Sequence, residues 1–88
     1  MKYIVECEKE GNEFVAVIPD LNYTSTYGKD EKEVLENIKE AALLYLEGLE
    51  EFPSTGFISN KKAANIRVIE ISKDNDEFKV TKISKITN

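Results

Sequence analysis

The sequence predicts an α+β domain in which one helix packs on one face of an antiparallel sheet, in the chain order strand, strand, strand, helix, strand, strand. Apolar and polar residues alternate near both ends of the chain, which is typical of half-buried strands. A single stretch of helical periodicity separates these two regions. The chain has 88 residues, enough for one core, so residues 1–88 are expected to form one domain.

The first part of the chain predicts a β-hairpin. Apolar and acidic side chains alternate over residues 3–8, and a second apolar run covers residues 14–18. Gly11 and Asn12, which lie between the two runs, are residues typical of tight turns. Pro19 is expected to end the hairpin, because proline has no N–H group to donate to a ladder.

A third strand is predicted over residues 21–27, which are rich in β-branched and aromatic types. Alternation places one set of side chains on a common face: Leu21, Tyr23, Ser25 and Tyr27. Tyr23 and Tyr27 either anchor a partner protein or pack beneath Tyr45. Gly28 is expected to end the strand.

Asp30 and Glu33 form a capping-box signature that predicts the start of a helix. Steps of about 100° per residue gather its apolar side chains on one face. That face is expected to cover the sheet and comprises Val34, Leu35, Ile38, Ala41, Ala42, Tyr45, Leu46 and Leu49. Leu43 and Leu44 fall outside it, either as ordinary surface leucines or as a contact with another subunit. Pro53 is expected to stop the helix.

The remaining residues predict a connecting loop and a second hairpin. Residues 54–65 resemble a loop, and residues 66–71 alternate as a fourth strand. Residues 74–76 are polar and suit a turn. A fifth strand is predicted from its apolar side chains, Phe78, Val80 and Ile83.

Charge is unevenly distributed along the chain. The sequence holds 17 acidic and 12 basic residues, a net charge of −5. Residues 1–57, the acidic body, hold 13 acidic residues and 5 lysines, a balance of −8, whereas residues 58–88 hold 4 acidic and 7 basic residues, a balance of +3. The net charge repels nucleic acid. The asymmetry favours self-association, a basic partner for the acidic body, or simply solvated strand faces.

The side chains on which most enzymes depend are scarce. Histidine is absent, which excludes Ser-His and Cys-His couples and imidazole metal ligands. Arg67 is the only arginine, so bidentate recognition of phosphate or guanine is nearly absent. Cys7 is the only cysteine and is expected to pack as a small apolar residue in a reducing compartment. We therefore expect a non-enzymatic protein without metal or cofactor.

Several acidic residues are candidates for chemistry, but each has a structural interpretation. Asp20 follows a proline and is expected to stabilise a turn. The pairs Glu6/Glu8 and Glu31/Glu33 lack the spacing of a calcium loop and are expected to lie on solvated faces. The sequence contains no signal peptide and no apolar run of about 18 residues, which predicts a cytoplasmic protein that does not enter a membrane.

A set of residues in positions 1 to 53 follows one characteristic order: Pro19, Asp20, Leu21, Gly28, Glu33, Leu35, Asn37, Glu40 and Ala41. Together with the helix sequence EVLENIKEAALLYLEGLEE, this order resembles the HicB-like antitoxin family. The resemblance implies a pared-down ribonuclease H-like fold without enzymatic activity. It also implies a partner, a small basic HicA-like ribonuclease toxin, whose catalytic surface the antitoxin covers.

The resemblance also raises the question of whether the protein binds DNA. Many antitoxins of this kind add a C-terminal helix-turn-helix or ribbon-helix-helix module, but residues 58–88 predict strands, so direct DNA binding is not expected. The candidate partner-binding residues are Tyr23, Ser25, Tyr27, Leu43 and Leu44. The chain is also expected to form a homo-oligomer, a dimer or higher. Two alternatives to an antitoxin are a homo-oligomeric scaffold of the same fold without a toxin, and a weak nucleic-acid binder that uses Lys79, Lys82 and Lys85.

Overall fold

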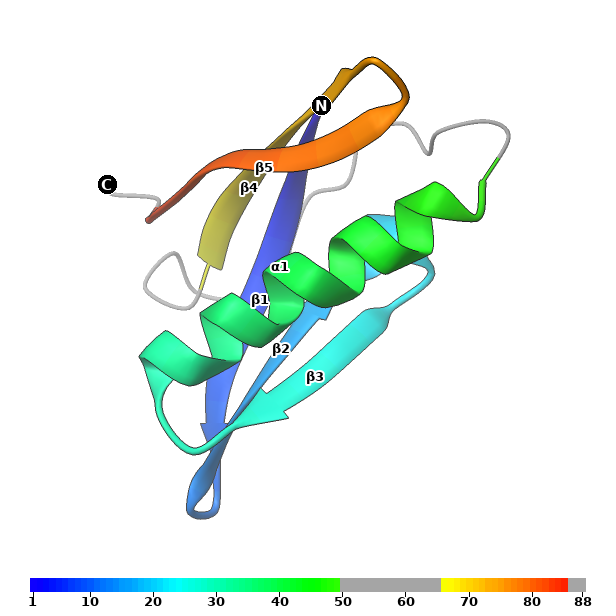
Figure 1. The fold of residues 1–88 in the computed structure, drawn as a ribbon. Helices are drawn as coiled ribbons and strands as arrows, with labels where there is room; N and C mark the ends of the chain where they lie inside the picture. The colour runs from blue at the N-terminus through cyan, green and yellow to red at the C-terminus, as the bar shows by residue number, and fades with distance from the viewer. Residues whose placement is uncertain (50–65, 86–88) are drawn as a thin grey trace.

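The computed structural model describes residues 1–49 and 66–85, and in them one α-helix packs on one face of a five-stranded antiparallel sheet. The predicted α+β class is confirmed. The elements are β1 (Lys2–Glu10), β2 (Glu13–Ile18), the 3-10 helix η1 (Pro19–Leu21), β3 (Thr24–Gly28), α1 (Glu31–Glu47), β4 (Ile66–Asp74) and β5 (Glu77–Lys85). The spatial order β3-β2-β1-β4-β5 places β3 and β5 at the two margins, and Figure 1 shows α1 across the front of the sheet.

Both predicted hairpins are confirmed. β1 pairs with β2 across Gly11 and Asn12, and Gly11 has a φ of 64°, which glycine adopts without strain. β4 pairs with β5 across Asn75 and Asp76, whose φ values are 49° and 67°. Positive φ at both central residues is the type I′ turn, whose twist matches that of the flanking strands.

The third strand is shorter than predicted, because the chain turns before it. The proline that opens η1 cannot donate to a ladder, and Asn22 and Tyr23 follow η1 with φ of 56° and 57°, which a strand cannot contain. β3 therefore begins at Thr24, whose hydroxyl donates to the Leu21 carbonyl at 2.6 Å. The predicted common face is wrong, since Leu21 is fully buried whereas Tyr23 is 67% exposed.

The start of α1 confirms the predicted cap. The Glu33 amide donates to Oδ1 of Asp30 at 2.8 Å, which satisfies one of the free N–H groups of the first turn. The Glu33 carboxylate in turn accepts a 3.0 Å hydrogen bond from the amide of Lys29, one residue before the donor of a standard capping box. Two reciprocal bonds therefore fix the direction in which the chain enters the helix.

A glycine lies at each end of α1, but only the first is required by close contact. A Cβ on Gly28 would lie 2.5 Å from the backbone nitrogen of Val34, so only glycine allows the end of β3 to approach the helix this closely. At its other end α1 stops at Glu47, with Gly48 as the C-cap. The helix therefore ends earlier than the predicted stop at Pro53, and the predicted loop over residues 54–65 lies outside the described residues.

The predicted apolar face of α1 covers the sheet. Its fully buried members are Val34, Ile38, Ala42 and Leu46, and Leu35, Ala41 and Tyr45 are partly buried. Leu49 also packs against the core but lies beyond the end of α1. The strands contribute Tyr3, Val5, Ile18, Ile69 and Ile71 to the same core. Leu43 is half-buried and packs against this core, so it is not an ordinary surface leucine. Leu44 is 71% exposed.

The only arginine is buried, which the sequence analysis did not predict. Arg67 is 7% exposed and lies opposite Val5 in the β1–β4 ladder. Its guanidinium forms an ion pair with Glu31 in the first turn of α1 and donates to the Ile66 carbonyl at 3.4 Å. Arg67 therefore joins β4 to the start of the helix.

Within residues 1–49 and 66–85, no helix has the length and apolar character needed to cross a membrane.

Candidate protein-interaction surface

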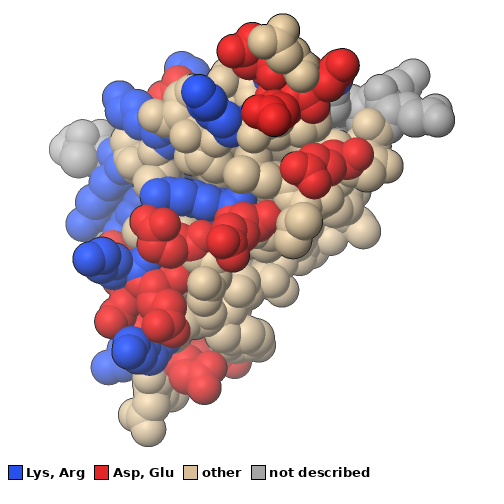
Figure 2. Space-filling view, viewed as in Figure 1, with Lys and Arg blue, Asp and Glu red and all other residues tan. Residues whose placement is uncertain are grey.

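The outward side of α1 is an acidic ridge, which we define as Glu36, Glu40, Leu43 and Glu47. Glu36 forms an ion pair with Lys39 at 2.9 Å, whereas Glu40 and Glu47 have no ion-pair partner among the described residues. A shallow hollow of about 370 Å³ lies here and is lined by Glu40, Leu43, Leu44 and Glu47. Figure 2 shows acidic groups following the line of α1. The ridge thus combines exposed carboxylates with apolar side chains.

The margin of the sheet beside α1 carries the other predicted partner-binding residues. Tyr23, just before β3, is 67% exposed, and Tyr27 in β3 is 55% exposed. The alternative prediction, in which these tyrosines pack beneath Tyr45, is therefore wrong. Ser25 lies between them and is also exposed. The structure thus gathers Tyr23, Ser25 and Tyr27 at one edge.

A residue of the HicB-like pattern, Asn37, connects this edge to the helix through a contact that was not predicted. Nδ2 of Asn37 donates a 2.9 Å hydrogen bond to the main-chain carbonyl of Tyr27. Leu44 is seven residues farther along α1, so it lies on the same side of the helix as Asn37. That side therefore faces the β3 margin, and Leu44 adds exposed apolar surface there.

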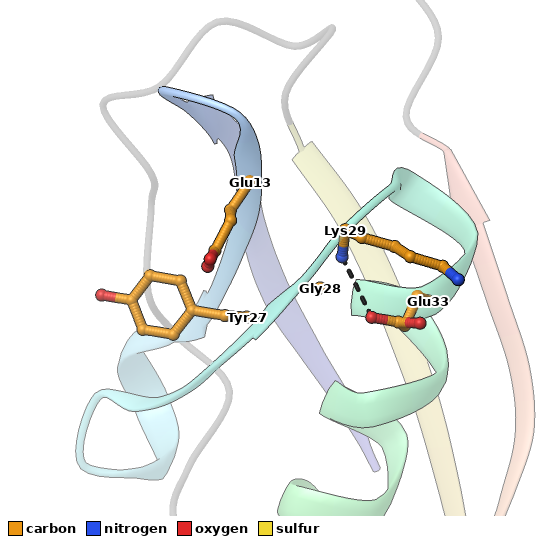
Figure 3. A pocket seen from close by; sticks show the side chains of 5 residues that line it. All are labelled: Glu13, Tyr27, Gly28, Lys29 and Glu33. Atoms are coloured by element: carbon orange, nitrogen blue, oxygen red, sulfur yellow. Dashed lines mark hydrogen bonds between the residues drawn. The ribbon is translucent and has the colours of Figure 1, made fainter.

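A second hollow, of about 230 Å³, lies at the end of β3 and is lined by Glu13, Tyr27, Gly28, Lys29 and Glu33. Figure 3 shows Glu13 and Tyr27 on one side of the strand, and Lys29 and Glu33 on the other. The Lys29 side chain extends away from the hollow, and the Glu33 carboxylate caps α1. These side chains therefore point in different directions and do not converge on one point.

The predicted acidic pairs Glu31/Glu33 and Glu6/Glu8 lie in different elements, the first in α1 and the second in β1. Glu31 pairs with Arg67, and Glu33 caps the helix. Glu6 and Glu8 lie in β1, opposite Val17 and Val15 of β2. In the described part of the chain, no three carboxylate, cysteine or histidine side chains gather as metal ligands would.

Two buried titratable groups have raised pKa values. Burial raises the pKa of the Cys7 thiol, and the charge of the nearby Arg67 guanidinium offsets only part of this rise. The thiol is therefore poorly suited to act as a nucleophile. Cys7 is 6% exposed and lies in the core. Burial, followed by the charge of Asp20, raises the pKa of the Tyr3 phenol. Asp20 itself is half-buried in η1, beside the core rather than in a cleft.

The lysines of β5 do not form one stripe. Lys79 and Lys82 lie opposite Ser72 and Glu70, whereas Lys85 lies opposite Arg67, whose side chain is on the helix side of the sheet. A single-stranded nucleic acid tracks a continuous positive groove. The division of these lysines between two faces gives no such groove.

The fold and these surfaces define a small α+β domain whose exposed features are an acidic helix ridge and an open, tyrosine-bearing sheet margin. Comparisons of the chain with protein-family models, with curated proteins and with solved structures found no match.

Proposed function

We propose that this protein is a non-catalytic binding module of the HicB antitoxin type, which neutralises a small basic ribonuclease by covering its active surface. The supporting observation is the acidic ridge of α1. Carboxylates at Glu40 and Glu47, which have no ion-pair partner among the described residues, border apolar surface at Leu43. This arrangement suits a partner with basic groups around an apolar contact.

The mode of action follows from the chemistry of the ridge. Carboxylates attract a cationic partner over a distance of about 8–10 Å at physiological salt, which accelerates encounter, whereas apolar contact slows dissociation. A ribonuclease that binds RNA through basic side chains presents the matching charge. Occupation of that basic surface excludes RNA, so inhibition requires no chemical step from the antitoxin.

The fold also supports the proposed function. One helix on an antiparallel sheet, preceded by a proline-aspartate-leucine turn and Gly28, is compatible with the pared-down ribonuclease H-like architecture of HicB-like proteins. Gly28 is needed for the close approach of β3 to α1, and the turn forms η1. The residues that carry the resemblance therefore have structural roles that hold the ridge in place.

The test is inhibition of a HicA-type ribonuclease encoded beside this chain. We expect the purified protein to form a stable complex with it and to stop its cleavage of messenger RNA. The variant Glu40→Lys/Glu47→Lys should weaken binding at least about tenfold, because it reverses the charge of the ridge.

The matched control is Glu10→Lys/Glu13→Lys, which makes the same change in net charge at the exposed β1–β2 turn. It should retain inhibition. Equal losses in both variants would mean that net charge alone, and not the ridge, attracts the toxin. The proposal is wrong if no short basic protein is encoded beside the chain, or if that protein stays fully active in the presence of this one.

A further inference from the structure

We infer that the outer edge of β3 is a self-pairing surface, on which a second copy of this chain adds its own β3 in antiparallel orientation and joins two five-stranded sheets into one. This inference does not rest on the proposed function, because the hydrogen-bonding groups that it uses belong to β3 and not to the acidic ridge. It rests on the direction of the backbone groups, on the distribution of exposed apolar side chains and on charge.

The backbone groups of Ser25 and Tyr27 point outward. Across the two-residue β1–β2 turn, Glu10 and Glu13 form the closing hydrogen-bonded pair, so alternate residues of β2 from Phe14 onward turn their backbone groups toward β3. Their partners in β3 are therefore hydrogen-bonded inward: Thr24, Thr26 and Gly28. Ser25 and Tyr27 alternate with these, and their N–H and C=O groups face away from β2.

The hydrogen bond from Asn37 confirms this direction. The Tyr27 carbonyl accepts from a side chain outside the sheet, at 2.9 Å, and is therefore not occupied by β2. A carbonyl oxygen has two lone pairs, so it can accept a second hydrogen bond. In the part of the chain that the structure describes, β3 has a neighbouring strand on one side only.

Exposed apolar surface concentrates at this edge. Within the described residues four large apolar side chains are exposed: Met1, Tyr23, Tyr27 and Leu44. Two of these, Tyr23 and Tyr27, flank the outward-facing Ser25 at the β3 margin, whereas Leu44 lies on α1, on the same side of the helix as Asn37. Tyrosine is among the residues that most often anchor protein interfaces.

Charge favours a second copy as the occupant. Residues 21–28 carry no charge, although the chain as a whole carries −5 and a third of its residues are charged. Figure 2 shows an uncharged strip along the lower right margin, where β3 lies in Figure 1. Two copies can therefore meet here without opposing like charges. The surface also offers a partner both donors and acceptors, as self-pairing requires.

The opposite edge of the sheet is protected in a way that β3 is not. β5 carries the exposed lysines Lys79, Lys82 and Lys85, and a register shift between Glu70 and Ile71 interrupts its ladder. Lysines and bulges are the features by which proteins prevent pairing at sheet edges. β3 has neither, so the two edges differ in the property that controls self-association.

The outward groups specify one register. If Ser25 lies opposite Tyr27 of the second copy, each such pair exchanges both of its hydrogen bonds, and the two-fold axis passes between the Thr26 residues of the two copies. Thr26 then forms a non-hydrogen-bonded pair, in which Cα atoms lie about 4.5 Å apart. Thr24 lies opposite Gly28 of the second copy, far from its own counterpart.

Sedimentation velocity over a range of concentrations tests the association. The natural chain should form a dimer. Ser25→Lys should weaken dimerisation at least about tenfold, because it places a charge of the same sign from each copy at the shared edge. Ser72→Lys is the matched control, since Ser72 is exposed in β4 and away from β3, and it should leave the dimer unchanged. A natural chain that remains monomeric at millimolar concentration would overturn the inference.

Disulfide cross-linking tests the register in a way that a general loss of folding cannot imitate. In a Cys7→Ala background, Thr26→Cys should form a disulfide-linked dimer under mild oxidation, because its Cα separation lies within the range of disulfides. Thr24→Cys should stay monomeric on a non-reducing gel. Cross-linking at position 24 but not at 26, or at neither position in a chain that dimerises, would show that the dimer uses a different surface.

Discussion

Asn37 in α1 donates a 2.9 Å hydrogen bond to the carbonyl of Tyr27, and so fastens the helix to the outer edge of β3. The contact joins the two surfaces of interest, because α1 carries the acidic ridge and β3 carries the open margin. A helix is otherwise free to shift along the apolar side chains that it covers, whereas a directed hydrogen bond fixes one position.

The first prediction concerns this bond. Asn37→Ala is expected to lower the free energy of unfolding by about 1 kcal/mol, the usual net value of an intramolecular hydrogen bond. Asn37→Asp should cost more than Asn37→Ala at neutral pH, because a carboxylate cannot donate and would face a carbonyl oxygen. Urea unfolding at concentrations below dimerisation measures both. Equal stabilities of all three proteins would show that the bond does not hold the helix.

The second prediction concerns the approach of β3 to the helix. Gly28→Ala places a Cβ within 2.5 Å of the Val34 nitrogen, and backbone atoms on both sides must move. Overpacking of this kind usually costs about 1–3 kcal/mol. Gly48→Ala is the control, because its Cβ would meet only an ordinary contact at 3.7 Å. Thermal unfolding of the two variants should show a large loss for the first and little change for the second.

Much of the fold could be predicted because local signals agreed with the final packing. Alternation predicted both hairpins, and the Asp30 cap and the apolar periodicity predicted the helix and its buried face. The third strand was predicted to begin too early. Its residues favour strand by composition, but the proline before them starts a 3-10 turn, and the left-handed Asn22 and Tyr23 delay the strand to Thr24.

The partner-binding role of the candidate residues stays a prediction. The tyrosines and Leu44 were singled out by type and periodicity, and all three are exposed, the tyrosines at the β3 edge and Leu44 on α1. The contacts of Asn37 and Arg67 were not predicted, because their partners are distant in the sequence. Arg67 reaches Glu31 across 36 positions, and no local pattern marks an arginine that will be buried. Long-range polar pairs of this kind depend on packing, which composition and periodicity do not reveal.

The third prediction follows from that ion pair. Arg67 is buried and Glu31 is 51% exposed, so replacing Arg67 should destabilise the protein more than replacing Glu31. Arg67→Ala removes buried packing as well as charge and should cost about 2–4 kcal/mol. Glu31→Gln keeps the shape and an acceptor, and should cost about 1 kcal/mol or less, because solvent screens a half-exposed carboxylate. Chemical unfolding of both variants measures the difference, and the opposite ranking would contradict it.

The fourth prediction concerns the β4–β5 turn. Asp76 has a φ of 67°, a conformation that glycine adopts without steric cost. Asp76→Gly creates the Asn-Gly pair that two-residue hairpins prefer and should stabilise the protein by about 0.5–1 kcal/mol. Asp74→Gly, at the last residue of β4 just before the turn, should instead destabilise the protein. Differential scanning calorimetry distinguishes these opposite signs.

The last prediction is a pH dependence. Burial, followed by the Asp20 carboxylate, raises the pKa of the Tyr3 phenol, so the folded state holds this proton more tightly than the unfolded state does. The resulting stabilisation is complete below about pH 10, the ordinary pKa of tyrosine, and is lost as the pH rises through the higher folded pKa. Tyr3→Phe cannot ionise and should lose stability less steeply above about pH 10.

The raised pKa of Cys7 acts in the same direction from about pH 8.5, the ordinary value for a thiol, so both proteins should carry Cys7→Ala. Urea unfolding at a series of pH values then gives the difference in stability between the protein that keeps Tyr3 and the Tyr3→Phe variant. That difference should be constant from about pH 7 to pH 9 and should shift in favour of the variant at higher pH, because only the tyrosine form loses its contribution. A difference that stays constant through about pH 12 would show that Tyr3 ionises equally in the folded and unfolded states.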